Sequence, residues 1–189
     1  AAVAGQEAPI KYLIVNAAEG DPGAFADRVL LESNPFAVIE GALLAAHTVG
    51  AHHGFVFVSS AYLLGAEILE RALVACRSAG LLGPDILGRD FDFDLTVVRS
   101  AGSYICGEET ALITALENQP PDPWVRPPYP AERGLWDAPT LVQNVETLAA
   151  VPALLNRGAD WFAGRGTPSR GGPRLVALTG AVTRPGLVE

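Results

Sequence analysis

The chain has 189 residues, of which 49% are hydrophobic, and its formal net charge at neutral pH is −8. This composition can build one well-packed domain and the start of a second, and it argues against an unfolded chain. The negative charge argues against a nucleic-acid groove, which needs a basic surface, so we expect no nucleic-acid partner. It leaves open a small phosphate-bearing ligand held by backbone N–H groups. The apolar runs are too short to cross a bilayer, so no direct membrane insertion is expected.

Short runs of β-branched and aromatic residues alternate with helical patterns along most of the chain. Strands are predicted at 12–15, 55–58 and 94–98. Helices are predicted at 36–48, 63–79, 110–116 and 145–155. Continuous apolar strands are typical of a parallel sheet that is buried on both faces. The alternation therefore predicts an α/β fold, with a parallel sheet flanked by helices and joined by right-handed crossovers.

The ends of two of these helices carry typical start and stop signals. Ser33, Asn34 and Pro35 precede the first helix as a cap and a first-turn proline. Gly80 follows the second helix, where a glycine is typical of the C-terminal end. These signals support the helical assignment on both sides of the second strand.

Residues 117–139 interrupt the alternation with many prolines and are expected to form a long loop. In this loop Arg126 lies near Tyr129 and Trp136, and an arginine beside aromatic rings can cover a nucleotide base. A tightly packed surface loop is the alternative. After this loop and the last helix, residues 172–189 predict two strands of a further β unit.

Each predicted strand leads into an unusual polar segment. These segments span residues 16–25, 59–62 and 99–110. The carboxyl ends of parallel strands meet at one edge of the sheet, where ligands of open α/β sheets bind. We therefore expect residues 16–23 and 99–109 to meet there and to form a binding site.

Acidic residues are concentrated in two of these segments. The first carries Glu19 and Asp21 after Asn16, and the third carries the adjacent Glu108 and Glu109. Separately, an Asx-rich turn and an acidic start of a helix would explain them. Together they predict acceptors for ribose or ribityl hydroxyl groups, with free N–H groups at the start of the helix binding a phosphate.

The histidines and cysteines show no spacing typical of a metal site. His47, His52 and His53 flank two glycines before the second strand, and we interpret them as C-terminal capping residues of the helix. Cys76 and Cys106 are too few for a disulfide framework and fit a reduced, cytoplasmic setting. Cys106 has no histidine nearby in the sequence, so we interpret it as a small buried residue. No metal ligand and no catalytic residue is predicted.

Five segments can be compared with known families. They are "NAAEGDPGAFADR" (16–28), "GRDFDFDL" (88–95), "AGSYICGEETAL" (101–112), "RPPYPAERGLW" (126–136) and "PTLVQNVETLAAVP" (139–152). As a set, and in this order, they resemble the FMN-carrying, NADH-binding subunit of respiratory complex I. They also resemble the related diaphorase subunits of NAD-linked hydrogenases and formate dehydrogenases. The resemblance implies a Rossmann-like domain over 1–165 and the first strands of a β-grasp domain over 172–189.

The resemblance also implies an activity and a set of binding residues. Hydride would pass from NADH to FMN, and electrons would leave to iron–sulfur centres outside this chain. The implied FMN-binding residues are Asn16, Glu19, Tyr104, Gly107, Glu108, Glu109, Val142, Gln143, Asn144 and Thr147. The implied NADH-binding residues are Asp21, Glu109, Arg126 and Tyr129. Glu109 would lie between the two cofactors.

In this family the remaining parts of the machinery lie outside the segment seen here. A glycine-rich loop around the flavin phosphate would precede residue 1, and a domain with a [4Fe–4S] cluster would follow residue 189. The chain contains no methionine, so we expect the central piece of a larger subunit, inactive by itself. Its implied partners are other subunits of a multisubunit oxidoreductase, including a thioredoxin-like iron–sulfur subunit. The implied location is cytoplasmic, or on a membrane through the larger complex.

Several positions depart from the family pattern. Ala18 and Ala61 stand where the family usually has acidic residues, and Gln143 replaces an asparagine. Arg126 and Tyr129 stand where a lysine and a phenylalanine are usual. These departures leave open an alternative, in which a divergent paralogue serves as a non-catalytic scaffold or docking module without flavin. The final electron acceptor also stays open between quinone, a hydrogenase and a formate dehydrogenase.

Overall fold

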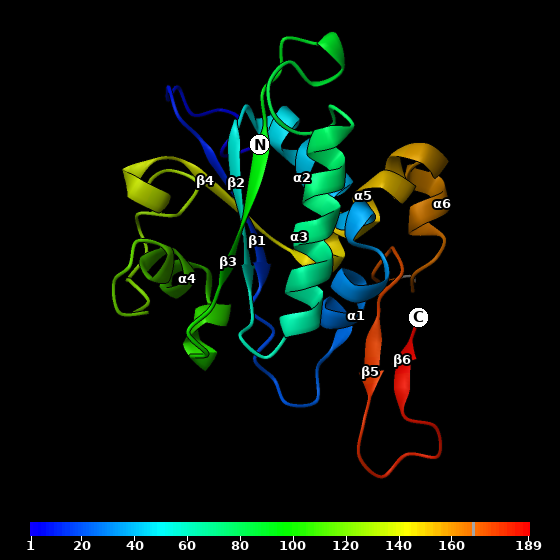
Figure 1. Ribbon diagram of the computed structural model, residues 1–189. Coiled ribbons are helices and arrows are strands. Elements are labelled where there is room, and N and C mark those ends of the chain that lie inside the picture. The colour runs from blue at the N-terminus through cyan, green and yellow to red at the C-terminus, as the bar shows by residue number, and fades with distance from the viewer. Residues whose placement is uncertain (168) are drawn as a thin grey trace.

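A four-stranded parallel sheet forms the centre of the molecule in the computed structural model, which describes residues 1–167 and 169–189 (Figure 1). Its strands are β1 (Tyr12–Ala17), β2 (His53–Val58), β3 (Asp94–Arg99) and β4 (Thr140–Asn144). The spatial order is β3, β2, β1, β4. The three predicted strands are parallel neighbours in this sheet, so the predicted α/β class is confirmed.

Helices cover both faces of the sheet. They are α1 (Ala26–Ser33), α2 (Pro35–Val49), α3 (Leu63–Ser78), α4 (Glu109–Leu116), α5 (Val145–Arg157) and α6 (Ala159–Ala163). Helices α1, α2, α3 and α5 lie on one side, and α4 lies on the other with the proline-rich loop (Figure 1). Strands β5 (Val176–Leu178) and β6 (Gly186–Val188) form a separate antiparallel pair. The two strands predicted in the C-terminal tail are therefore confirmed.

The alternation of side chains along the strands creates two hydrophobic cores. In β1, Leu13 and Val15 point into the core beneath α1, α2, α3 and α5. Ile14, between them, points into the core beneath α4, together with Phe57 of β2. Successive side chains of a strand point to opposite faces, so β1 and β2 are buried on both sides as predicted.

The residues predicted to start or stop helices lie at the ends of those helices in the structure. The Asn34 side chain accepts a hydrogen bond from the backbone N–H of Ala37 at 3.3 Å, and Pro35 is the first residue of α2. Gly80 follows α3 with a φ of +68°, a left-handed conformation that favours glycine. The start of α2 and the end of α3 are therefore set by local chemistry that can be read from the sequence.

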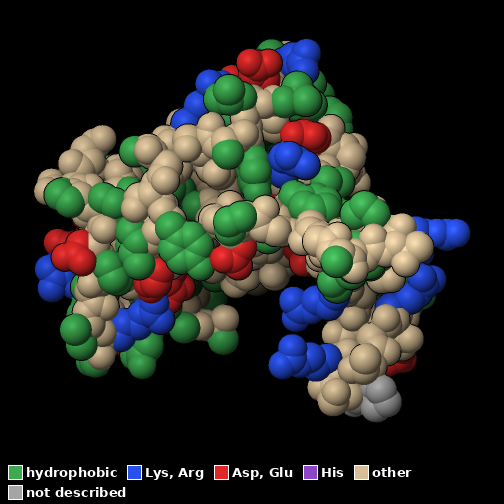
Figure 2. Space-filling model, turned by 90° about the horizontal axis from the view of Figure 1, so that it is seen from below, with side chains coloured by type: hydrophobic (Ala, Val, Ile, Leu, Met, Phe, Trp, Pro, Cys, Tyr) green, Lys and Arg blue, Asp and Glu red, His purple; other side chains and the backbone are tan. Residues whose placement is uncertain are grey.

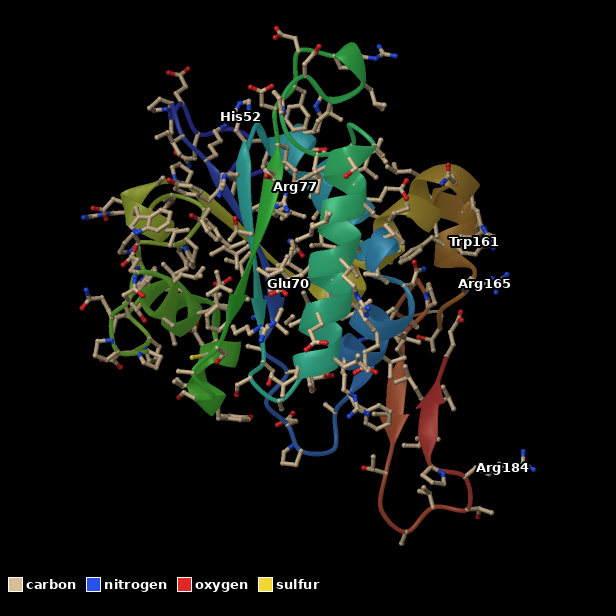
Figure 3. The ribbon with its side chains drawn as sticks, in the orientation of Figure 1. His52, Glu70, Arg77, Trp161, Arg165 and Arg184 are labelled. Atoms are coloured by element: carbon tan, nitrogen blue, oxygen red, sulfur yellow. The ribbon has the colours of Figure 1, made fainter. Side chains whose placement is uncertain are left out.

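The interpretation of the three histidines needs a correction. His47 does lie in the last turn of α2, but the cap is the backbone N–H of Gly50, which donates to the carbonyl of Ala46. His53 is the first residue of β2, and the His52 ring contacts the carbonyl oxygen of Asp92 at 2.9 Å. Figure 3 shows His52 at the end of the sheet opposite the loops that follow the strands. Only His47 is thus in a position to act on the helix end.

Two ion pairs join α3 to the adjacent strand β3. Arg77 lies 2.9 Å from Asp94, and Arg99 lies 3.2 Å from Glu70. Figure 3 shows Glu70 and Arg77 on the side of α3 that faces β3. These pairs are partly exposed, so each contributes at most about 1 kcal/mol and mainly orients the helix.

Among the described residues, no single helix is long and apolar enough to cross a membrane. Helices α1 and α2 meet the length and composition criterion only when taken together, and they are bent by 99° relative to each other.

Candidate functional site

The loops that follow β1 and β3 meet at the carboxyl edge of the sheet, as predicted. The Asn16 side-chain amide donates to the carbonyl of Gly107 at 2.9 Å. The Tyr104 hydroxyl donates to the Asp21 carboxylate at 3.0 Å, which raises the pKa of Tyr104. Figure 2 is seen from this side and shows acidic side chains in the middle, at the left and at the top of the face, with basic side chains beside them at the left and top and further basic ones at the right. The two segments therefore form one surface.

Glycines allow this close approach of the two loops. A Cβ atom on Gly20 would lie 2.8 Å from the ring of Tyr104, closer than side-chain atoms normally pack. A Cβ atom on Gly107 would lie 3.3 Å from the carbonyl oxygen of Ala18. Larger residues at these positions would push the loop after β3 away from the loop after β1.

Three cavities open at this edge among the described residues. One, of about 540 Å³, is bordered by the loops after β1, β2 and β3, and the other two adjoin each other at the start of α4. The larger of these two has a volume of about 580 Å³ and is bordered by the loop after β1, the start of α1, the loop after β3 and the start of α5. The smaller, of about 370 Å³, lies against the start of α4 and the end of β4. Both are bordered by Asn16, Gly107, Glu108 and Asn144, so these four residues separate one cavity from the other.

The structure brings together nearly all the residues that the sequence singled out. The larger cavity is lined by Asn16, Glu19, Asp21, Tyr104, Gly107, Glu108 and Asn144. The smaller is lined by Asn16, Gly107, Glu108, Glu109, Arg126, Val142, Gln143, Asn144 and Thr147. Tyr129 is exposed in the proline-rich loop and borders neither cavity.

Glu108 and Glu109 form a charged cluster with Arg126 at the start of α4. Glu108 is the N-cap residue, and its carboxylate accepts from the backbone N–H groups of Thr110 and Ala111 at 2.8 and 2.9 Å. Arg126 pairs with Glu108 and also lies 3.0 Å from Glu109. Partial burial alone would raise the pKa of Glu108, but these hydrogen bonds and the arginine charge together lower it. Glu108 is thus held ionised, and both carboxylates are paired with Arg126.

This cluster corrects one expectation about phosphate binding. The sequence predicted free N–H groups at the start of the helix, but Glu108 already accepts from those of Thr110 and Ala111. An N-cap side chain satisfies donors that a phosphate would otherwise use. The start of α4 is therefore a capped helix end, and a phosphate would have to displace the Glu108 carboxylate to bind there.

Glu19 caps a different helix, α1, from the preceding loop. Its carboxylate accepts from the backbone N–H groups of Ala26 and Asp27 at 3.0 and 3.2 Å. The Tyr62 hydroxyl, in the loop after β2, donates to the same carboxylate at 2.9 Å. Burial and this hydrogen bond raise the pKa of Tyr62. Glu19 therefore joins the loops after β1 and β2 to the start of α1.

Asp27, in the first turn of α1, extends this network to β4. Asp27 is 5% exposed, and its carboxylate accepts from the Asn144 side-chain amide at 2.9 Å. The side-chain oxygen of Asn144 in turn accepts from the backbone N–H of Glu146 at 2.8 Å, and this hydrogen bond caps α5. Burial, followed by the negative charge of Glu19, raises the pKa of Asp27 to about 7. This carboxyl group therefore titrates near neutral pH.

Sequence reasoning missed Asp27 and Glu146 as residues of this edge, and it placed segment 59–62 there without assigning a role to Tyr62. Asp27 and Glu146 line the larger cavity, and Glu146 also accepts from the backbone N–H of Leu175 at 2.7 Å. Asp27 stands inside the conspicuous segment 16–28, so its acidic type was visible. Its burial was not, because the helix that carries it was not predicted.

The side chain of Cys106 lies in the interior of the molecule and not at the carboxyl edge. Cys106 is 1% exposed and belongs to the core beneath α4, which confirms that it is a small buried residue. Within residues 1–167 and 169–189, no three His, Cys, Asp or Glu side chains are grouped so as to hold a metal ion.

The chemistry of the two cavities fits part of a flavin nucleotide. Carboxylate and amide oxygens are suitable acceptors for the hydroxyl groups of a ribityl chain or ribose. However, none of the described residues that line the larger cavity is a lysine, an arginine or a histidine. The residues of this cavity therefore fit the hydroxyl-bearing parts of FMN, whereas its phosphate needs donors outside it; Arg28 of α1 lines the neighbouring cavity of about 540 Å³.

An open parallel sheet with a polar cavity at its carboxyl edge defines the class of α/β nucleotide-binding domains. Within that class, residues 2–153 match the family model described as the Nuo51 FMN-binding domain, and the chain belongs to this family. The resemblance carried by the five sequence segments is therefore confirmed.

Curated relatives and solved structures agree with this family. The chain is 44% identical to an NADH-quinone oxidoreductase subunit of Escherichia coli (strain K12), covering 95% of this chain and 40% of the relative. It is 43% identical to the HndC subunit of the NADP-reducing hydrogenase of Solidesulfovibrio fructosivorans, covering 98% of this chain and 38% of the relative. A crystal structure of NAD⁺-reducing [NiFe]-hydrogenase in the H₂-reduced state matches with a TM-score of 0.91 and 40% identity, covering 98% of this chain and 31% of that chain. The chain thus spans less than half the length of these relatives.

Proposed function

We propose that this chain is part of an NADH:acceptor oxidoreductase subunit, which binds FMN and NADH at the carboxyl edge of the sheet. Electrons would leave to iron–sulfur centres outside this chain. The observation that carries the proposal is the convergence of Asn16, Glu108 and Asn144, from three separate segments, on two adjoining cavities. The family match supports it, as do relatives that are named as NADH-quinone oxidoreductase and hydrogenase subunits.

FMN, when bound, supplies the acceptor for the hydride of NADH. The contribution of this chain is binding, orientation and charge. Its FMN-binding residues would be Asn16, Glu19, Tyr104, Gly107, Glu108, Glu109, Val142, Gln143, Asn144 and Thr147. Its NADH-binding residues would be Asp21, Glu109, Arg126 and Tyr129. Because Arg126 is paired with both glutamates, the nucleotide would have to compete with an existing ion pair.

The wider context of the chain is part of the same proposal. Residues 1–165 would be the Rossmann-like domain, and the β5–β6 pair within 172–189 would begin a β-grasp domain. The partners would be further subunits of a multisubunit oxidoreductase, including a thioredoxin-like iron–sulfur subunit, with a [4Fe–4S] cluster carried outside residues 1–189. The complex would be cytoplasmic or attached to a membrane through other subunits.

Two observations favour the alternative, a scaffold or docking module that does not hold flavin. Arg126 pairs with both Glu108 and Glu109, the two carboxylates expected to face the cofactors. In addition, Ala18 lines the larger cavity where the family usually has a carboxylate. If the ion pairs persist in solution, Arg126 occupies one oxygen of each glutamate that a ligand would otherwise use.

Measuring bound flavin and NADH oxidation on the same preparation separates these two functions. The full-length protein is titrated with FMN, and NADH oxidation is then followed with ferricyanide as the acceptor. We expect stoichiometric flavin and flavin-dependent turnover, and both should fall in Asn16→Ala. Asn156→Ala, at the exposed end of α5, is the matched control and should behave as the wild type. A protein that folds but retains no flavin would support the scaffold.

A further inference from the structure

Asp27 is a buried titratable group at the edge of the proposed flavin site. It is 5% exposed, yet it borders the larger cavity together with Asn144. Its carboxylate is paired with a neutral amide, and among the described residues it forms no salt bridge with a cation. Burying a carboxylate without a cation costs free energy when the group is charged, so the ionised form of Asp27 destabilises the folded chain.

The contacts of Asp27 fix the orientation of the Asn144 amide. The Asn144 nitrogen donates to Asp27, and the Asn144 oxygen accepts from the backbone N–H of Glu146. A flipped amide would place its oxygen against the carboxylate and its N–H₂ group against another donor, so both hydrogen bonds would be lost. Asn144 is exposed at the cavity. Asp27 therefore determines which amide atoms of Asn144 a ligand meets.

The groups around Asp27 make the protonation of its carboxylate depend on what fills the cavity. Glu19 approaches it from the loop after β1, Glu146 from α5, and Tyr62 from the loop after β2. The charged side chains of α2 and α3, the other helices packed on α1, are exposed to solvent: these are Glu40, Glu67, Glu70, Arg71 and Arg77. On α1 itself, Arg28 is engaged with Glu32 at 4.0 Å.

The larger cavity concentrates negative charge. Its carboxylates are Glu19, Asp21, Asp27, Glu108 and Glu146. Water in the open cavity screens these charges, and a ligand that displaces the water removes that screening. The carboxyl group that is buried deepest responds most easily by taking a proton.

We propose that Asp27 is a positioning residue that orients Asn144 toward the ligand and takes up one proton from solvent when the cavity is filled. The proton adds to the Asp27 carboxylate, and no other bond changes. The protonated carboxyl group keeps an oxygen that accepts from Asn144, so the orientation persists while the charge disappears. The inference rests on the proposed function, because the ligand it invokes is FMN.

The proposal gives the affinity for FMN a defined pH dependence. Proton uptake on binding makes the affinity fall as pH rises above the pKa of the ligand-free carboxyl group, by up to about tenfold per pH unit. The FMN phosphate titrates near pH 6, so measurements between pH 7 and 9 see a constant ligand charge. The histidines of the chain lie at the opposite end of the sheet, near the start of β2.

FMN titrations of the full-length protein over this pH range test the proposal. The wild type is compared with Asp27→Asn, which keeps an acceptor for Asn144 but cannot titrate, and with Asp27→Leu, which has no acceptor. Asp122→Asn, in the exposed proline-rich loop, is the control and should follow the wild type. We expect a dissociation constant that rises at least threefold per pH unit in the wild type and stays constant in Asp27→Asn. Asp27→Leu should bind about tenfold more weakly than Asp27→Asn at every pH, since the amide is no longer oriented.

Equal pH slopes in the wild type and Asp27→Asn would overturn the proton uptake, and equal affinities in Asp27→Asn and Asp27→Leu would overturn the positioning role. In either case, normal FMN binding would leave the proposed function intact. A wild type that binds no FMN at any pH would overturn both the proposed function and the linked proton uptake. The positioning role is then decided on ligand-free protein, by whether the Asn144 side-chain amide signals shift near neutral pH in the wild type and not in Asp27→Asn.

Discussion

Two carboxylates at the same edge of the sheet have opposite surroundings. Asp27 is buried, faces Glu19 and Glu146, and has a pKa raised to about 7. Glu108 is partly exposed, caps α4, pairs with Arg126, and has a lowered pKa. The two groups line the same cavity. Position at a binding edge therefore does not determine how a carboxylate behaves, whereas burial, donors and a cation do.

The two groups make opposite contributions to the pH dependence of folding. A raised pKa favours the protonated form, so the contribution of Asp27 is present below its unfolded pKa of 3.8 and is lost as pH rises toward about 7. A lowered pKa favours the ionised form, so the contribution of Glu108 is present above its unfolded pKa of 4.5 and is lost in acid. Variants of Asp27 and Glu108 should therefore change the stability in opposite pH ranges.

The largest expected effect is a gain of stability in Asp27→Asn. A pKa raised from 3.8 to about 7 corresponds to a destabilisation of roughly 4 kcal/mol above pH 7, at about 1.4 kcal/mol per pH unit. The neutral amide removes this cost and keeps an acceptor for Asn144. Urea unfolding of ligand-free protein at pH 5 and pH 8 should show a gain at pH 8 and a much smaller one at pH 5. Glu32→Gln, on the same helix, is the control; a gain that does not depend on pH would contradict the assigned burial.

The second largest expected effect is a loss of stability when the Glu19 carboxylate is removed. In Glu19→Ala, two backbone donors at the start of α1 and the Tyr62 hydroxyl lose their shared acceptor. Hydrogen bonds to charged groups contribute about 1.5–3 kcal/mol, and the loss of repulsion with Asp27 offsets part of this. We expect roughly 2–3 kcal/mol less stability by urea unfolding. Glu67→Ala, on the exposed face of α3, should change stability by less than about 0.5 kcal/mol; similar losses in both variants would count against the cap.

Glu108→Ala tests the exposed cluster at the other cavity wall. The loss of an N-cap side chain costs about 1 kcal/mol of stability. This loss should shrink in acid, as pH falls through the lowered pKa of Glu108 and the wild-type carboxylate is protonated. Flavin affinity should fall by roughly ten- to a hundredfold, equivalent to one hydrogen bond to a charged acceptor. Thermal unfolding and flavin content of the full-length protein measure both effects. Normal flavin content together with lower stability would show that Glu108 acts only as a helix cap.

The smallest structural effect is expected for Glu109→Gln. Glu109 is not the cap, and its ion pair with Arg126 is partly exposed, so stability should change by less than about 0.5 kcal/mol. Its effect should fall on the KM for NADH, with flavin content unchanged. Steady-state NADH oxidation with an artificial acceptor tests this division. Loss of flavin in this variant would mean that the two glutamates do not have separate roles.

The sheet and its long helices could be predicted from the sequence because their signals are local. Apolar runs such as 55–58, the Asn34 cap and Gly80 each act within a few residues of the element that they define. The meeting of the two loops also follows, because parallel strands place their carboxyl ends on one edge.

Elements with non-local support could not be predicted in this way. Helix α1 has Phe25 at its N-cap position and no local side-chain cap; Glu19 supplies the cap from several residues upstream. Strand β4 has three apolar or β-branched residues before Gln143, too few to predict a strand, and it is stabilised by pairing with β1. Helix α6 has only five residues. Because α1 was missed, the burial of Asp27 was missed with it.

Anaerobic titration of the FMN-loaded, full-length protein with NADH tests the flavin site most directly, with the flavin absorbance as the readout. If the carboxyl edge binds both cofactors, FMN stays with the protein through gel filtration, and about one equivalent of NADH bleaches it. Asn16→Ala should retain less flavin and bleach in proportion to what it retains. A folded protein that loses its FMN on the column, or holds FMN that NADH does not bleach, would contradict the assignment of this edge as the flavin and NADH site.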